Sequence, residues 1–316
     1  MASWGDLGSV RQTIDYDTLL PIISRLPLPI GQRLAQARGW IHGLIDYDWR
    51  SQGIGQYYVR EATLQAMQAL MPEAGKKVQL LYTLRRFMHH SREEWESYLF
   101  RNQKVMQSIF ENSQIEGLEA LIEAQKNGKS LVLLTSHLDS YCMGIVLMGM
   151  SGLRLNVMTT AALKDPRLDP VIHTFFQKKI QGLEMHIQGG KLMSHEKNLS
   201  YFYRTLSRGE AVVIQADLPA APNADAIAVP FLGGIRRMSA GAQRLAIKTN
   251  SLMAAYLCLH QGVGKYKVIC TPPKTIDPAH PERTLEPIYQ FIETHIRQFP
   301  DRWLAADLFR VYENAN

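Results

Sequence analysis

The 316-residue sequence contains only three cysteines, and no two of them form a Cys-x-x-Cys pair. An odd number of thiols cannot pair completely, so Cys142, Cys258 and Cys270 are expected to stay reduced, as in a cytoplasmic protein. Histidine and cysteine also nowhere follow the spacing of a zinc site. These absences predict a protein without a disulfide framework and without a metal.

Long apolar runs are missing as well. A helix that spans a bilayer needs about 18 or more apolar residues, and the longest apolar stretches, 141–155 and 252–259, are too short or too interrupted. Residues 1–12 lack the basic and apolar regions of a signal peptide. We therefore expect a soluble cytoplasmic protein, with at most a peripheral contact at the inner membrane.

The charge is modest and spread along the chain. Charged residues make up 20% and hydrophobic residues 46% of the sequence, which is ordinary for a globular chain and excludes wholesale disorder. The formal net charge of +6 either keeps the protein in solution or attracts an acidic partner, such as a membrane surface, a phosphorylated acceptor or an acidic carrier protein. No block of like charges concentrates it, and we expect no nucleic-acid partner.

The sequence predicts a helical segment over residues 1–116, which packs on the rest of the chain. Between residues 30 and 45, apolar residues at three- and four-residue spacing indicate an amphipathic helix: Ile30, Leu34, Ala37, Trp40, Ile41 and Leu44. Ranges 61–70, 78–88 and 93–110 show similar patterns. We interpret this region as a helical cap over a core, and we find no catalytic motif in it.

From residue 117 onward, short apolar runs alternate with helical patterns. The continuous apolar runs 130–135 and 211–215 predict buried strands. Further strands are predicted at 153–158, 183–187, 252–259 and 265–270. This alternation predicts one α/β domain over residues 117–316, with a mixed, largely parallel sheet flanked by helices.

One histidine lies where α/β proteins usually bind ligands. His137 follows the predicted strand 130–135 and precedes a predicted helix, 140–150. A histidine in this position can accept a hydroxyl proton near neutral pH, as attack on an acyl thioester requires. The alternative is a structural histidine that is held by hydrogen bonds, and placement alone does not exclude it.

Two neighbours of His137 are candidates to act with it. Asp139 is expected to cap the following helix, or else to orient His137 and stabilise its imidazolium form. Cys142 falls in the first turn of that helix, where the helix dipole and a nearby imidazole favour a thiolate nucleophile. Alternatively, Cys142 is a small buried apolar residue.

A second group of candidates follows the strand 211–215. The residues predicted to bind substrate are Asp217, Phe231, Gly233, Arg236 and Arg237. Glycine allows a ligand to approach the backbone closely, and paired arginines can bind phosphate or carboxylate. The alternative is a hairpin or loop that carries a solvated pair of charges.

In their order and spacing, these segments resemble the lysophospholipid acyltransferase superfamily, and specifically its lipid A late acyltransferase branch. The resemblance extends from about residue 118 to residue 310. It rests on the strand 131–135 with His137 and on the segments 162–179, 208–217, 229–233, 239–246 and 299–303.

This resemblance implies an activity. His137 would deprotonate a hydroxyl or amine acceptor, which then attacks an acyl thioester held by acyl carrier protein or coenzyme A. The acceptor would be a small molecule, a lipid or a carrier-bound intermediate. The family implies no metal, no permanently bound cofactor and no covalent intermediate, and its members work at the inner face of a membrane.

Two departures from the family pattern change these expectations. The family has Asp or Glu where this chain has Cys142, so either Asp139 serves as the acid or Cys142 and His137 form a covalent transacylase or thioesterase. Where the lipid A enzymes have Tyr-Arg-Pro, this chain has Met158-Thr159-Thr160. That loss, together with the lack of the family's N-terminal membrane helix, favours a non-phosphorylated acceptor in a specialised lipid or natural-product pathway. A third interpretation is a non-catalytic homologue that binds a lipid or a carrier.

Overall fold

The computed structural model describes residues 9–50, 58–160, 165–221 and 224–312. Its helices are α2 (Leu20–Ser24), α3 (Leu28–Leu44), α5 (Val59–Leu70), α6 (Lys76–Leu99), α7 (Gln103–Glu111), α8 (Leu118–Lys126), α9 (Tyr141–Met150), α10 (Pro170–Glu184), α11 (His195–Ser207), α12 (Gly241–Thr249) and α13 (Glu282–Gln298). Shorter or irregular helical turns are η1 (Thr13–Leu19), η3 (Pro300–Arg302) and η4 (Ala306–Val311). The strands are β1 (Gln114–Glu116), β2 (Leu131–Thr135), β3 (Leu155–Thr159), β4 (Leu192–Ser194), β5 (Ala211–Gln215), β6 (Ala226–Phe231), β7 (Gly234–Ser239), β8 (Leu252–Gly262), β9 (Lys265–Cys270) and β10 (Lys274–Thr275).

The strands form one mixed sheet and a separate hairpin. The order in the sheet is β1-β9-β8-β2-β5-β3-β4, with β10 added to β8, and β6 pairs with β7 alone. Neighbouring strands from β8 through β2, β5 and β3 to β4 run parallel, whereas β9 runs antiparallel to β8. The predicted fold class is therefore confirmed: a mixed, mostly parallel sheet flanked by helices, with a helical N-terminal segment.

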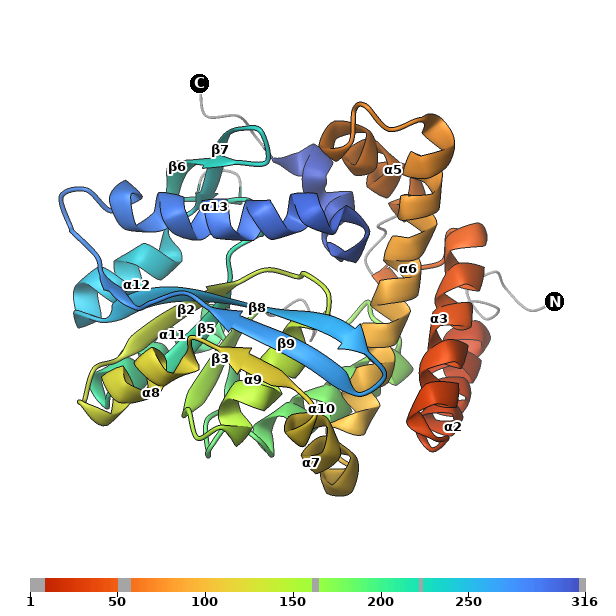
Figure 1. Cartoon of the computed structure of the whole chain (residues 1–316), viewed down its shortest axis with the longest axis horizontal. Coiled ribbons are helices and arrows are strands. Elements are labelled where there is room, and N and C mark those ends of the chain that lie inside the picture. Colours follow the sequence, from red (N-terminus) through yellow and green to blue (C-terminus); the bar gives the residue numbers. More distant parts are fainter. Residues whose placement is uncertain (1–8, 51–57, 161–164, 222–223, 313–316) are drawn as a thin grey trace.

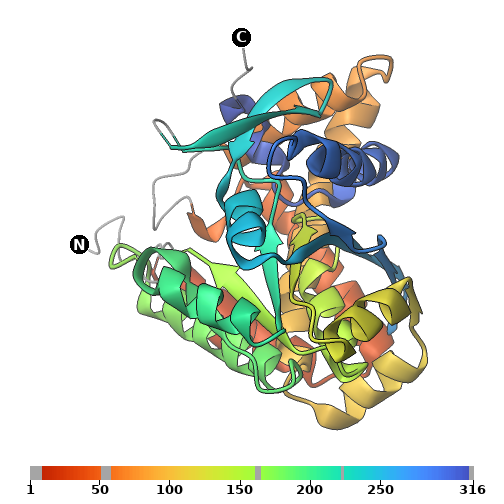
Figure 2. The ribbon, with the colours of Figure 1, turned by 90° about the vertical axis from the view of Figure 1, so that its left-hand side faces the viewer.

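The central strand β2 is buried on both faces, as its continuous apolar sequence predicts. Leu131 and Leu133 point into the core beneath α8, α9 and α10. Val132 and Leu134 point into the core on the opposite face, against α12 and α13. Figures 1 and 2 show the resulting three layers, with α13 and α12 on one side of the sheet and α8 and α9 on the other.

One predicted strand is wrong. Residues 183–187 do not form a strand, because α10 continues to Glu184 and is followed by turns; the neighbouring edge strand, β4, begins at Leu192. The helix keeps one buried row through Phe175, Lys179 and Leu183, at spacings of four residues. Leu183 therefore completes a helical face, and a short apolar run could not reveal this by itself.

The N-terminal helix predicted between residues 30 and 45 forms as α3, but its apolar row does not face the core. Ile30, Leu34, Ile41 and Leu44 are all exposed. The face that packs along α6 carries small and polar residues instead: Gly31, Gln32, Ala35, Arg38, Gly39 and Gly43. Figure 1 shows α3 lying alongside α6 at the margin of the molecule.

Glycine and one arginine explain this orientation of α3. A Cβ atom added to Gly39 would lie 2.5 Å from the backbone of Phe87 and Met88, so the two helices approach as closely as their backbones allow. Arg38 enters the same seam, where its guanidinium donates to Asp15 at 2.6 Å and to Glu94 at 2.6 Å. The buried charges are thus paired, which buried ions require.

Two further sequence predictions concern membrane-spanning helices and the division of the chain. In the described ranges no helix has the length and apolar character that crossing a bilayer requires. The division between residues 1–116 and 117–316 stays a prediction; it falls at the end of β1, which pairs with β9.

Replacing Gly39 with alanine tests the close contact between α3 and α6. The added methyl group must push the backbones apart, so we expect the free energy of unfolding to fall by about 1–3 kcal/mol. Urea denaturation followed by circular dichroism measures this change. The matched control is Gly241→Ala in α12, where a Cβ atom meets nothing closer than the Ser239 hydroxyl at 3.5 Å. The control should be neutral or slightly stabilising, and equal losses for both variants would contradict the packing argument.

Candidate functional site

The register of two parallel strands brings His137 and Asp217 together. Thr135, the last residue of β2, pairs with Gln215, the last residue of β5. His137 and Asp217 each lie two residues beyond these strand ends, at the carboxyl edge of the sheet. The His137 Nδ1 atom lies 2.9 Å from Asp217 Oδ1, and the His137 backbone N–H donates to Asp217 Oδ2 at 2.8 Å.

This contact determines which nitrogen of His137 is free to act. A carboxylate only accepts hydrogen bonds, so Nδ1 carries a proton, and in the neutral imidazole the lone pair is then on Nε2. The ring is about one quarter exposed, and the edge contact with Tyr141, with ring centroids 5.0 Å apart, helps to hold it. A buried aspartate orients the imidazole in the same way in Ser-His-Asp triads.

Asp217 is held in turn by the C-terminal part of the chain. Its side chain is fully buried, and the Trp303 indole Nε1 donates to Oδ2 at 2.9 Å. The Tyr312 hydroxyl donates to the Asp217 backbone carbonyl, and the Leu304 N–H donates to the His137 carbonyl at 2.7 Å. Because two oxygens of one buried carboxylate have three donors, Asp217 has little freedom to turn away from the imidazole.

His137 lines a pocket of about 230 Å³, called here the His137 pocket. Its apolar walls include Phe175, Phe176, Leu218 and Leu304. Charged side chains also reach it, among them Lys179, Arg50, Arg86, Glu93 and Glu94. A cavity with apolar walls and a few polar groups suits a substrate with both kinds of surface.

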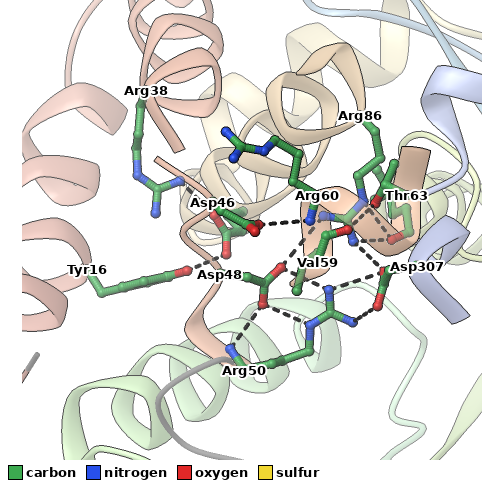
Figure 3. Close-up of polar contacts among 12 residues, drawn as sticks. Tyr16, Arg38, Asp46, Asp48, Arg50, Val59, Arg60, Thr63, Arg86 and Asp307 are labelled. Carbon is green, nitrogen blue, oxygen red and sulfur yellow. Dashed lines mark hydrogen bonds and ion pairs between the residues drawn. The ribbon is translucent and has the colours of Figure 1, made fainter. Parts of the chain in front are cut away.

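Two arginines on the pocket wall belong to a compensated network of ions (Figure 3). Arg50 pairs with Asp48 at 2.8 Å and with Asp307 at 3.1 Å. Arg86 donates to the Leu304 carbonyl at 3.0 Å and to Asp307 at 3.0 Å. Burial disfavours the Asp48 carboxylate, but the Arg50 guanidinium outweighs this and holds the pKa of Asp48 well below its usual value. The network therefore joins the N-terminal segment to η4 behind the pocket.

Asp139 has partners other than His137. Its fully buried carboxylate accepts hydrogen bonds from Arg92, from Arg302 at 2.9 Å and from the His260 N–H at 2.8 Å. Helix α9 begins after Ser140, and no side chain caps it. Among the contacts of the described residues, none joins Asp139 to His137. Asp139 instead stabilises the turn between β2 and α9, where its own φ of 54° lies in the left-handed region.

Cys142 is placed on the buried side of α9. Its side chain is 4% exposed and belongs to the core beneath the sheet. Burial raises the pKa of the Cys142 thiol, and the nearby Lys179 ammonium offsets only part of this effect. Burial of the thiol therefore outweighs the effect of the helix N-terminus, which the sequence suggested would favour the thiolate.

Of the five residues predicted to bind substrate, only Asp217 reaches His137. Phe231 is buried against the rings of Tyr289 and Tyr312, and Gly233 forms the turn of the β6–β7 hairpin with a φ of 75°. Arg236 and Arg237 lie on β7. These four residues lie outside the lining of the His137 pocket, in a hairpin that packs on α13.

A second pocket, of about 500 Å³, lies at the same edge of the sheet, between α10 and the ends of β3 and β4. Phe176 lines both pockets. The uncharged polar residues of the second pocket are Thr159, Thr160, Gln177, Gln181, Ser194 and Asn198. Its described lining contains no Asp, Glu, Lys or Arg side chain. Thr159 and Thr160 are part of the segment Met158-Thr159-Thr160, where the resemblance to the lipid A enzymes leads one to expect Tyr-Arg-Pro.

The three thiols should be unreactive in the folded protein. Burial raises the pKa of Cys142 and Cys258, and that of Cys270 to about 12, so all three stay protonated at pH 8. We expect maleimide to label the native protein at least about a hundredfold more slowly than the protein unfolded in urea. Peptide mapping identifies the labelled residue. Rapid labelling of Cys142 in the native state would show that its thiol is accessible and ionised.

Comparison with known proteins gives a family match. No curated protein matches the sequence. A family model described as bacterial lipid A biosynthesis acyltransferase matches residues 71–306, well over half of the chain. The matched range runs from the end of α5 into η4 and contains His137, Asp217 and Trp303. The resemblance found in the sequence is thereby confirmed: this chain belongs to the bacterial lipid A biosynthesis acyltransferase family and is an acyltransferase enzyme.

Proposed function

We propose that this acyltransferase uses His137 as a general base that Asp217 orients. The observation that carries the proposal is the hydrogen bond between His137 Nδ1 and the buried Asp217 carboxylate, which leaves Nε2 with its lone pair on a residue that lines a pocket. Proximity of a base to a bound hydroxyl or amine is what acyl transfer from a thioester requires.

The reaction follows from that arrangement. Nε2 accepts the proton of the acceptor hydroxyl or amine as its oxygen or nitrogen attacks the thioester carbonyl. The new C–O or C–N bond forms, the C–S bond breaks, and the imidazolium returns its proton to the departing thiolate. During this cycle the Asp217 carboxylate stabilises the positive charge on His137, and its burial strengthens that interaction.

In this proposal Asp217 also takes the place of the acid that the family pattern has at the position of Cys142. Cys142 stands at that position, and a neutral thiol gives an imidazolium no electrostatic partner. Asp139, the other candidate, is already engaged by Arg92, Arg302 and the His260 N–H. Asp217 approaches the same imidazole from the neighbouring strand, so the chain keeps a carboxylate beside its base although the local motif has lost one.

The proposal also covers the acyl donor. We expect an acyl thioester of acyl carrier protein or coenzyme A and no permanently bound cofactor. The described part of the chain has no group of three His, Cys, Asp or Glu side chains that could hold a metal ion. The apolar walls around His137, including Phe175, Phe176 and Leu218, suit an acyl group next to its reacting carbon.

The acceptor is expected to present an uncharged polar group. The second pocket shares Phe176 with the His137 pocket, and its described lining has hydroxyl, amide and imidazole (His173) side chains but no Lys or Arg to pair with a phosphate. We therefore propose a lipid, small-molecule or carrier-bound acceptor that is not phosphorylated at this position, in a specialised lipid or natural-product pathway. A cytoplasmic location with peripheral contact at the inner membrane belongs to the same proposal.

Substitution of the two site residues tests the mechanism. His137→Ala should lower kcat by about a thousandfold or more, and Asp217→Asn by about a hundredfold to ten-thousandfold, because the amide neither fixes the ring nor stabilises its charge. Thiol release from a series of acyl-coenzyme A and acyl carrier protein thioesters, with hydroxylated acceptors, measures the rate. Asp277→Asn, an exposed position that caps its own turn, is the matched control. Near wild-type rates in Asp217→Asn would rule out its proposed role.

A covalent route through Cys142 makes different predictions. Since the thiol is buried and protonated, we expect no acyl adduct on Cys142 after incubation with acyl thioesters, as intact-protein mass spectrometry would show. Cys142→Ala should keep turnover within about threefold of wild type, because it removes only a small buried side chain. An adduct together with an inactive Cys142→Ala variant would establish the transacylase or thioesterase instead.

A further inference from the structure

Lys179 is a cation of the His137 pocket that the reaction described above leaves without a role. It lies on α10, one turn after Phe175, which lines the same pocket. Its side chain is 8% exposed, and its ammonium lies 2.5 Å from Oε1 of Glu93, a buried residue of α6 that also lines the pocket. A buried ion pair often adds nothing to stability, because desolvation of both charges offsets their attraction. The position of this pair on a pocket wall therefore points to a role in the chemistry.

The hydrogen bonds of Lys179 differ from those of the two arginines that reach the pocket. Arg50 and Arg86 each bond to several carboxylate or carbonyl oxygens in the network of Figure 3. An ammonium has three N–H donors. Among the residues that the structure describes, Glu93 alone accepts a hydrogen bond from Lys179. Lys179 therefore has the greater capacity to donate to a group that enters the pocket.

The Tyr141 ring connects Lys179 with His137. The Lys179 Nζ atom lies 5.6 Å from the centroid of this ring, and the same ring lies 5.0 Å from the imidazole. In the proposed reaction, His137 activates the acceptor at the thioester carbonyl, and Phe175 and Phe176 are walls for the acyl group. A cation beside both the base and these walls is suited to contact the carbonyl oxygen of that thioester.

The Lys179 side chain carries a stable positive charge. Burial favours its neutral amine, but Cys142 and the Glu93 carboxylate outweigh this effect and raise the pKa of Lys179 above its ordinary value. Because the buried Cys142 thiol is itself protonated, the carboxylate is the partner that keeps the ammonium charged. At neutral pH Lys179 is thus a fixed cation, which suits electrostatic stabilisation rather than proton transfer.

We propose that Lys179 is a catalytic residue, which stabilises the oxyanion formed when the acceptor attacks the thioester. As the acceptor oxygen or nitrogen bonds to the carbonyl carbon, the π electron pair of the C=O bond moves to its oxygen. That oxygen then accepts a hydrogen bond from Lys179 Nζ. The C=O bond forms again as the C–S bond breaks, and the departing thiolate takes its proton from His137, while Lys179 keeps its own protons. The inference rests on the proposed function, because it assigns a role in the same reaction.

Replacing Lys179 with methionine, which is similar in length but uncharged, tests this role. Lys179→Met should lower kcat by about a hundredfold to a thousandfold, as loss of one oxyanion donor does. The Kd of an S-alkyl thioether analogue of the best donor should stay within about threefold of wild type, because the analogue has no carbonyl group. Isothermal titration calorimetry measures this Kd. The matched control is Lys191→Met, which removes an exposed lysine paired with Glu184 at 3.2 Å and should leave both values unchanged.

A double variant separates catalysis from the stability of the ion pair. Lys179→Met leaves the buried Glu93 without its partner, whereas Lys179→Met/Glu93→Gln removes both charges and so avoids an unpaired buried ion. Circular dichroism should show the double variant folded, and its kcat should be as low as that of Lys179→Met. A double variant with the wild-type kcat would show that the pair is only structural and would overturn the proposal.

The remaining outcomes distinguish this role from that of His137. A kcat of Lys179→Met within about threefold of wild type overturns the oxyanion role, and an inactive His137→Ala then leaves the proposed function standing. A rise in Kd for the thioether that accounts for the whole loss of activity also overturns it, since Lys179 would then bind the ground state. If His137→Ala stays active and Lys179→Met does not, the proposed base is wrong and the oxyanion role is supported.

Discussion

The in-register pairing of β2 with β5 is the constraint on which the site depends. Each strand ends two residues before a polar side chain, and parallel pairing places those side chains next to each other at the carboxyl edge of the sheet. The hydrogen bonds that the ring and the backbone N–H of His137 donate to Asp217 then fix the imidazole in one orientation. A slip of one residue between the strands would turn the two side chains to different faces.

The C-terminal segment completes this site from outside the sheet. Trp303 donates to the Asp217 carboxylate, and Leu304 supports the backbone of His137. Arg302, in the same stretch, reaches Asp139 and so also stabilises the turn that follows His137. The three neighbouring residues thus hold both sides of the loop that carries His137, and they lie within the matched family region.

The N-terminal helices show a different use of polar and apolar residues. Along the contact of α3 with α6, close backbone approach at Gly39 and the ion pairs of Arg38 take the place of an apolar interface. Because these contacts need the small and charged side of α3, the apolar side remains outward. One helix thereby supports the fold with its polar side while its apolar side stays exposed.

The α/β class, the buried central strands and the family could be predicted from the amino-acid sequence, because continuous apolar runs and the spacing of the motifs report local structure directly. It also singled out both His137 and Asp217, but not as partners, since they are far apart in the chain and come together only through the strand register. Periodicity likewise identified α3 as a helix, but it could not show that the apolar row faces solvent. The tertiary structure settles both points, because spacing shows only that apolar residues share a face, whereas the neighbouring backbone and charges set where that face points.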